Sequence, residues 1–210
     1  MDAQRFFTDE EKDRIEKAVN AAEQQTSGEI VPMIVGASAR YAEVELLGGT
    51  VGLLGGTAAA LLWHDPWGRV EMQLLCPLVG AVVGYILCRV PAIKRKLIPK
   101  TRVAQAVDAR AFAAFTANGL HHTKAHTGIL ILASLLEHRV EVLADHGINE
   151  KVQPGTWDDV VRILTAGLRS GDACNAFCQA IEKCGKILAE HFPRSPDDRD
   201  ELADKLIIEK

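Results

Sequence analysis

The sequence predicts an α/β domain, with helices packed on a small central sheet, that is interrupted after its first strand by a hairpin of two transmembrane helices. Two apolar runs, Val44 to Trp63 and Val70 to Val90, predict the hairpin, because about 20 apolar residues in a helix span the ~30 Å core of a bilayer. Two continuous apolar runs, Glu29 to Val35, which Ile and Val dominate, and Gly128 to Leu136, predict buried strands on either side of it. Residues 1–43 and 91–210 would then form one domain, and residues 44–90 the inserted hairpin.

The short connection and the small residues of the two runs support a hairpin. Only His64 to Arg69 join the runs, so two helices here would lie antiparallel and adjacent. Helices in lipid associate where small residues let their backbones approach. Glycines recur at a spacing of four in both runs and form the expected packing face: Gly48, Gly52, Gly56, Gly80 and Gly84. A buried hairpin of a soluble core is the alternative, and the length and flanks of the runs argue against it.

The charges predict an orientation and limit the partners. Basic residues follow the second run closely, whereas the connection holds only Arg69 against Asp65. By the positive-inside rule the basic end is cytoplasmic, and a hairpin returns the chain to the side from which it entered. We therefore expect the soluble part on the cytoplasmic side and membrane lipids among the partners. A net charge of −4 and a pI of about 6.0 argue against nucleic acid as a partner.

Capping residues and helical periodicity predict four helices in the soluble part. A capping box of Thr8 and Glu11 begins the first. Thr156, with acidic residues after it, is expected to cap the third. The expected ranges are Asp9 to Gln25, Val103 to Asn118, the stretch from Thr156 to Gly171, and Ala173 to His191.

The remaining elements are short. Pro32 predicts that the first strand is an edge strand or carries a bulge, because proline cannot donate to a ladder. Alternation from Arg139 to Ala144 predicts a third strand, paired with Gly128 to Leu136 as a β-hairpin. One helical turn is expected at Asn149 to Val152. The polar tail, with its apolar patch Leu206 to Ile208, is expected to pack loosely or stay mobile.

Two groups of residues are candidates for a site. Glu29 opens the first strand and Asp145 follows the third, and carboxylates at loop ends suit Ca²⁺ or Mg²⁺. A turn or capping role for Asp145 is the alternative. His121, His122 and His126 crowd the loop before the second long strand. With His146 nearby, they could coordinate a transition metal or hold phosphate, or they could be an exposed polar loop.

Other catalytic signatures are missing from the sequence. It contains no CX5R loop, no P-loop and no G-x-S-x-G elbow. Its five cysteines lack the spacing of a zinc site, and those of the last long helix are expected to fill the core. Phosphatase activity would therefore need a metal or an acid.

Three stretches carry a family resemblance. They are FTDEEKDRIEKAVNAAEQQTSGEIVPMIV at residues 7–35, TGILILASLLEHRVEVLADHGI at 127–148, and TWDDVVRILTAGLRSGDACNAFCQAIEKCGKILAEHFP at 156–193. Together they resemble the TPM domain family of membrane-anchored thylakoid and bacterial proteins. The resemblance implies helices on a central sheet, and for some members a phosphatase activity or divalent cations. Asp145 looks like the acidic position after the corresponding strand in that family. Here an insertion splits the domain, which departs from the single membrane helix that often follows it.

These observations lead to two expected functions. The first is a membrane-anchored module that interacts with a membrane protein complex or acts in its assembly or maintenance, with a bacterial inner membrane as the expected location. Its motive is the glycine-rich hairpin, whose small faces could pack on a partner helix. The second is a weak acid phosphatase that depends on a divalent metal, which the family resemblance implies.

Overall fold

A computed structural model gives the structure of the chain and describes residues 3–62, 70–194, 202 and 204–209. The chain divides into two compact units. We call Met1–Ser38 with Ala104–Lys210 the sheet unit, and Ala39–Val103 the helix-pair unit. The expected connection at His64 to Arg69 lies outside the described residues.

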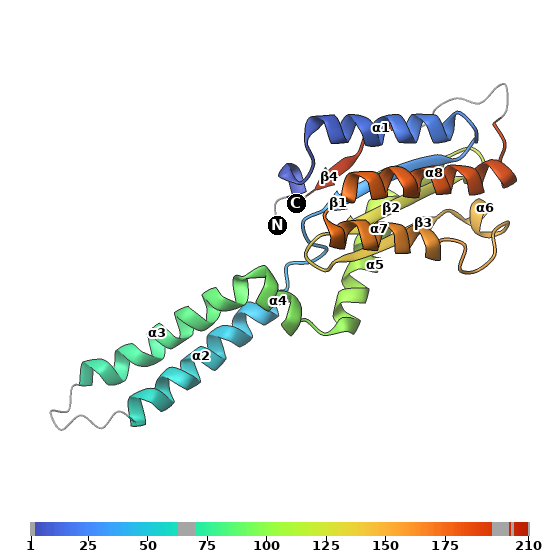
Figure 1. Cartoon of the computed structure of the whole chain (residues 1–210). Helices are drawn as coiled ribbons and strands as arrows, with labels where there is room; N and C mark the ends of the chain where they lie inside the picture. The colour runs from blue at the N-terminus through green and yellow to red at the C-terminus, as the bar shows by residue number, and fades with distance from the viewer. Residues whose placement is uncertain (1–2, 63–69, 195–201, 203, 210) are drawn as a thin grey trace. The chain divides into compact units, whose positions relative to one another are not determined.

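The sheet unit is built on a four-stranded mixed sheet with the strand order β3-β2-β1-β4 (Figure 1). β1 (Glu29–Val35) and β2 (Gly128–Ser134) are parallel neighbours, and every residue of both is buried. β3 (Arg139–Ala144) runs antiparallel to β2, and β4 (Ile207–Glu209) pairs in parallel with the end of β1. The two continuous apolar runs are therefore central strands buried on both faces, as their composition predicts.

Three helices pack on one face of this sheet: α1 (Asp9–Glu23), α7 (Asp158–Ser170) and α8 (Ala173–His191). α8 lies between the other two and contacts both (Figure 1). Ile15, Val19 and Ala22 of α1 join Ile30 and Ile34 of β1 in the main core. The capping box predicted at Thr8 is present, with Glu11 N–H donating to the Thr8 hydroxyl over 3.2 Å. The α/β class, with helices packed on a small central sheet, is confirmed.

The remaining elements of the sheet unit are α5 (Lys100–Ala117), which crosses the boundary between the units, and three short helices. These are η1 (Ala3–Arg5), η2 (Leu120–His122) and α6 (His146–Asn149). α5 begins three residues before the predicted start at Val103 and ends one residue before the predicted end at Asn118. The predicted turn at Asn149 to Val152 is wrong, because Asp145 caps the helix earlier and α6 begins at His146.

The prediction for Pro32 is wrong, because β1 is a central strand with unbroken register. The backbone nitrogens of β1 alternate in direction: Glu29 donates to Thr127 ahead of β2, whereas Gly36 donates to Glu209 of β4. Pro32 shares the parity of Gly36, so its nitrogen faces the side of β4. Pairing with β4 begins only at Met33, so the missing N–H interrupts no ladder.

Two further predictions need correction. Thr156 does not cap α7, since its hydroxyl donates to the Gln153 carbonyl oxygen over 2.6 Å and the cap position is Trp157. The tail is not loosely packed throughout, because Ile207–Glu209 form β4. The apolar patch therefore extends the sheet beside β1.

The helix-pair unit contains α2 (Ala42–Leu62), α3 (Val70–Arg89) and the short α4 (Pro91–Leu97). Close approaches join Gly48 to Gly84, Gly52 to Gly80, and Gly56 to the backbone of Cys76. Rising numbers on α2 meet falling numbers on α3, so the two helices are antiparallel. A β-carbon on any of the five expected glycines would lie within 2.6 Å of a backbone oxygen of the opposite helix. These glycines therefore form the seam along which the backbones meet.

A buried ion pair fixes α4 within the same unit. Lys94 is 8% exposed, and its Nζ donates to Glu45 Oε1 over 2.8 Å and to the Arg40 carbonyl oxygen over 2.7 Å. Both partners of this ammonium lie at or before the first turn of α2. Among the described residues, α2 is long and apolar enough to cross a membrane, and α3 joins it only if Gln73–Arg89 and Pro91–Leu97, bent by 89°, count as one span.

Candidate functional site

The site residues gather at the end of the sheet where β1 and β2 begin. The chain enters β2 from the loop after η2 and leaves β3 into α6, and the two strands are antiparallel. Asp145 N–H donates to the Gly128 carbonyl oxygen over 2.9 Å, which fixes the exit of β3 beside the entry of β2. The loop that carries His126 therefore lies against α6.

Gly147 permits this contact. A β-carbon on Gly147 would lie 2.7 Å from the carbonyl oxygens of both Ala125 and His126. Such contacts are shorter than real β-carbons make, so a larger residue would push the loop away from α6. The glycine that follows His146 is thus what lets His126 reach the same place.

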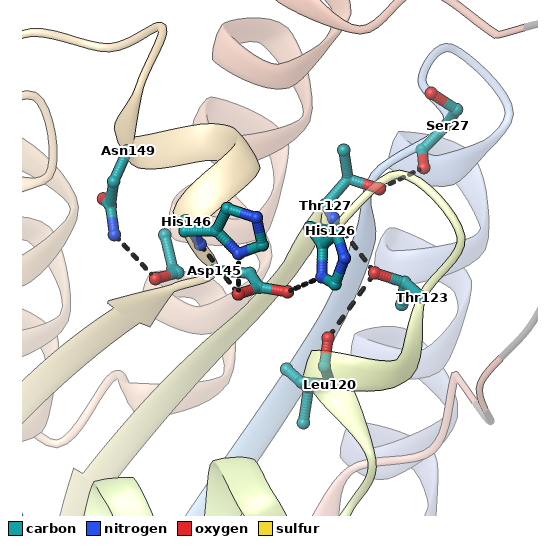
Figure 2. Close-up of polar contacts among 9 residues, drawn as sticks. Ser27, Leu120, Thr123, His126, Thr127, Asp145, His146 and Asn149 are labelled. Carbon is teal, nitrogen blue, oxygen red and sulfur yellow. Dashed lines mark hydrogen bonds and ion pairs between the residues drawn. The ribbon is translucent and has the colours of Figure 1, made fainter.

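Hydrogen bonds hold the His126 loop in shape (Figure 2). Thr127 N–H donates to the Thr123 hydroxyl over 3.0 Å, and the Thr127 hydroxyl donates to the Ser27 carbonyl oxygen over 2.9 Å. His126 itself has a φ of 54°, in the left-handed region that non-glycine residues rarely adopt. The residue with this unusual backbone conformation is the one whose imidazole contacts Asp145.

Asp145 is the centre of the group, and Figure 2 shows an imidazole on each of its oxygens. His126 Nδ1 lies 3.2 Å from Oδ2, and His146 Nδ1 lies 3.1 Å from Oδ1. His146 N–H also donates to Oδ1 over 2.7 Å, which makes Asp145 the N-cap of α6. The carboxylate is 10% exposed, and the His126 and His146 side chains are 46% and 61% exposed. The group is thus a buried carboxylate with two imidazoles that solvent can reach.

The Asp145 carboxylate carries a negative charge. Burial acts to raise the pKa of Asp145, but the hydrogen bonds from the His146 backbone and from both imidazoles outweigh it and hold the pKa below its usual value. An ionised carboxylate only accepts hydrogen bonds, so each Nδ1 that faces it carries a proton. His126, Asp145 and His146 are also the one cluster among the described residues with ligand atoms close enough for a metal ion, all within 4.8 Å of one another.

The structure does not bring Glu29 into this group. The Glu29 carboxylate accepts a hydrogen bond from Leu202 N–H over 3.3 Å and lines a 140 Å³ pocket with Glu23 and Asp204. Burial, together with the charges of Glu29 and Asp204, raises the pKa of Glu23 to about 9. Glu29 and Asp145, the two predicted ligands, therefore lie at the same end of the sheet, but their carboxylates belong to different clusters.

His121 and His122 also stay apart from Asp145. Both lie in η2, with their ring centroids 3.8 Å from each other. Of the three predicted loop histidines, only His126 contacts the Asp145 carboxylate. The second imidazole on this carboxylate is that of His146. The sequence signal for His146 was its position in the Asp-His-Gly turn directly after a strand.

This geometry defines an α/β domain with an inserted pair of apolar helices and a His-Asp-His group where its parallel strands begin. Residues 96–187 match the model of the TPM domain. The resemblance predicted from the sequence is therefore confirmed over this stretch. No curated protein matches the chain. The NMR structure of the BA42 protein from the psychrophilic bacterium Bizionia argentinensis resembles it with a TM-score of 0.62 and 22% identity, over 98% of this chain and 97% of that one. At this identity the likeness supports the fold alone.

Proposed function

We propose that α2 and α3 are a transmembrane hairpin that anchors the TPM domain to a membrane, and that the anchored protein acts with an integral membrane protein complex. The observation that carries the proposal is the division of residues on the helix pair: glycines face inward and large aliphatic side chains face outward. In water this division would be costly, because the apolar area is left uncovered. In lipid it is the expected arrangement.

The outward face is extensive. Among the described residues, the large hydrophobic side chains that are exposed belong to the helix-pair unit, with Phe112 as the exception. Leu54, Leu62 and Leu74 are 64%, 84% and 68% exposed. In the most apolar 18-residue stretch of α2, only 17% of the residues are buried, whereas most residues of a core helix in a soluble protein are buried. This exposure supports lipid as the surroundings of both helices.

Basic residues support an orientation with the soluble part on the cytoplasmic side. They gather from the last residue of α3 to the start of α5: Arg89, Lys94, Arg95, Lys96, Lys100 and Arg102. Positive charge next to a span favours the cytoplasmic side. A bacterial inner membrane is the location that we propose.

Because α2 and α3 pack on each other through their glycines, a partner would bind a different surface from the one expected from the sequence. The sequence pattern offered the glycine faces for a partner helix, but the helix pair uses them internally. Gly55 is different, since a β-carbon there would meet nothing within 4 Å. A partner would therefore contact the outward side chains, such as Val79 and Val83, which are 51% and 48% exposed.

A photo-crosslinking scan tests the partner. A photoreactive residue is placed in turn at each outward position from Leu74 to Leu87 in the full chain, and cells are irradiated. A packed partner helix should give protein adducts at every third or fourth position. Adducts to lipid alone at all positions would refute the partner and leave the anchor in place.

The second candidate is a phosphatase that depends on a divalent metal. The His126–Asp145–His146 group is the observation that favours it, because it offers a metal position beside solvent. The purified full chain should then hydrolyse a phosphoester only with added metal, and Asp145→Ala should abolish the reaction. Hydrolysis that is absent with Mg²⁺, Ca²⁺ and Zn²⁺ would exclude this candidate.

A further inference from the structure

We propose that His126, Asp145 and His146 bind one transition-metal ion of the Zn²⁺ class, and that this ion ties the loop before β2 to α6. The proposal does not depend on the membrane anchor, because all three residues belong to the sheet unit. It differs from the Ca²⁺ or Mg²⁺ site expected for Asp145 with Glu29.

The donor atoms select the ion. Ca²⁺ takes six to eight oxygen ligands, and Mg²⁺ keeps an octahedral shell of oxygens. Here the donors beside Asp145 are imidazole nitrogens, and Glu29 turns to another cluster. Two imidazoles with one carboxylate are a ligand set that suits Zn²⁺ and its neighbours in the first transition row.

The spacing fits the same ion. Ligands at roughly 2.0–2.1 Å from a tetrahedral Zn²⁺ lie about 3.3 Å from one another. The two Nδ1–carboxylate distances are 3.2 and 3.1 Å, each to a different oxygen of Asp145, and the ligand atoms of the three residues all lie within 4.8 Å of one another. An ion between these atoms would replace the two Nδ1 protons, and each neutral ring would then carry its proton on Nε2. The exposed side of the group leaves room for water at the fourth position.

Capping of α6 alone does not account for the arrangement. The cap needs only Oδ1 and the His146 N–H. The second oxygen, Oδ2, contacts the imidazole of His126, whose backbone is in the left-handed region. Gly147 leaves the space that this contact needs. Both features act on the position of His126, which the cap does not use.

Zinc titration of the full chain in mild detergent, after removal of metals with a chelator, tests the proposal. Isothermal calorimetry should show one ion per chain. His126→Ala, His146→Ala and Asp145→Asn each remove a proposed ligand and should each weaken binding by more than about tenfold, because the loss of a partner outside the ligand shell already costs about 10–100-fold. Asp145→Asn still caps α6. His122→Ala is the matched control: it removes an imidazole from the same segment and should bind as wild type does.

Two measurements distinguish Zn²⁺ binding at this site from binding at the cysteines and from binding of Ca²⁺ or Mg²⁺. Co²⁺ should give visible bands without the thiolate charge-transfer absorption that binding at Cys174 and Cys178 would produce, and far-UV circular dichroism verifies that each variant is folded. Ca²⁺ and Mg²⁺ at the same concentrations should not compete with Zn²⁺. Absence of Zn²⁺ binding, or binding that survives in folded His126→Ala and Asp145→Asn, would overturn the proposal.

Discussion

Replacing Gly52 with leucine should force α2 and α3 apart. A β-carbon on residue 52 would lie 2.0 Å from the Gly80 carbonyl oxygen and 2.7 Å from its carbon. Contacts below 3.0 Å are essentially never seen, so the backbones must separate by at least 3.0 − 2.0 = 1.0 Å at this level. A gap of that size forfeits roughly a quarter to a half of the dispersion attraction, and overpacking typically costs about 1–3 kcal/mol.

Distances between spin labels measure this separation. The labels are placed on cysteines introduced at Leu54 and Leu78, which are 64% and 62% exposed, in a full chain whose native cysteines are replaced. Gly52→Leu should lengthen the mean distance by about an ångström or more and broaden its distribution. Gly55→Leu, on the same helix with open space around it, is the matched control and should leave the distance unchanged. An unchanged distance in Gly52→Leu would show that the helices do not meet along the glycine seam.

Two further predictions concern protonation and orientation. Burial raises the pKa of Glu23 to about 9 from its ordinary value of 4.5, so the stabilisation from its protonated form is full below about pH 4.5 and is lost as pH rises through 9. Glu23→Gln keeps an acceptor for the Ile30 N–H and should melt with a weaker dependence on pH than wild type between about pH 5 and 9; equal slopes would contradict this assignment. A cysteine at Leu62, the end of α2, should react with an impermeant thiol reagent in intact cells when the native cysteines are replaced. Labelling of a cysteine at Asp9 instead would reverse the orientation.

Much of the fold could be predicted because local patterns and burial agree. The residues of β1 are apolar on both faces, and the structure buries both. Thr8 and Glu11 form a cap that depends on four consecutive residues only. β4 was missed because three residues within a polar tail pair only when β1 is already in place beside them. Pro32 misled because the sequence does not show which side of the strand its nitrogen faces.

The site could be predicted only in part, for a related reason. Strand order places Glu29 and Asp145 at one edge of the sheet, which the sequence suggested. The direction of each side chain depends on its neighbours: Glu29 lies beside Glu23 and the Leu202 N–H, and Asp145 lies between two imidazoles. The contact between His126 and α6 requires Gly147 in a position that only the folded chain reveals.

The membrane anchor is the central claim, and alkaline extraction of membranes from cells that express the full chain tests it most directly. A chain held by two spanning helices should remain in the membrane pellet after a carbonate wash and float with the vesicles in a density gradient. Replacing the outward Leu54 and Leu78 with arginine should shift the chain toward the soluble fraction, because charged residues at these positions oppose insertion. Complete release of the unmodified chain into the carbonate supernatant would contradict the anchor.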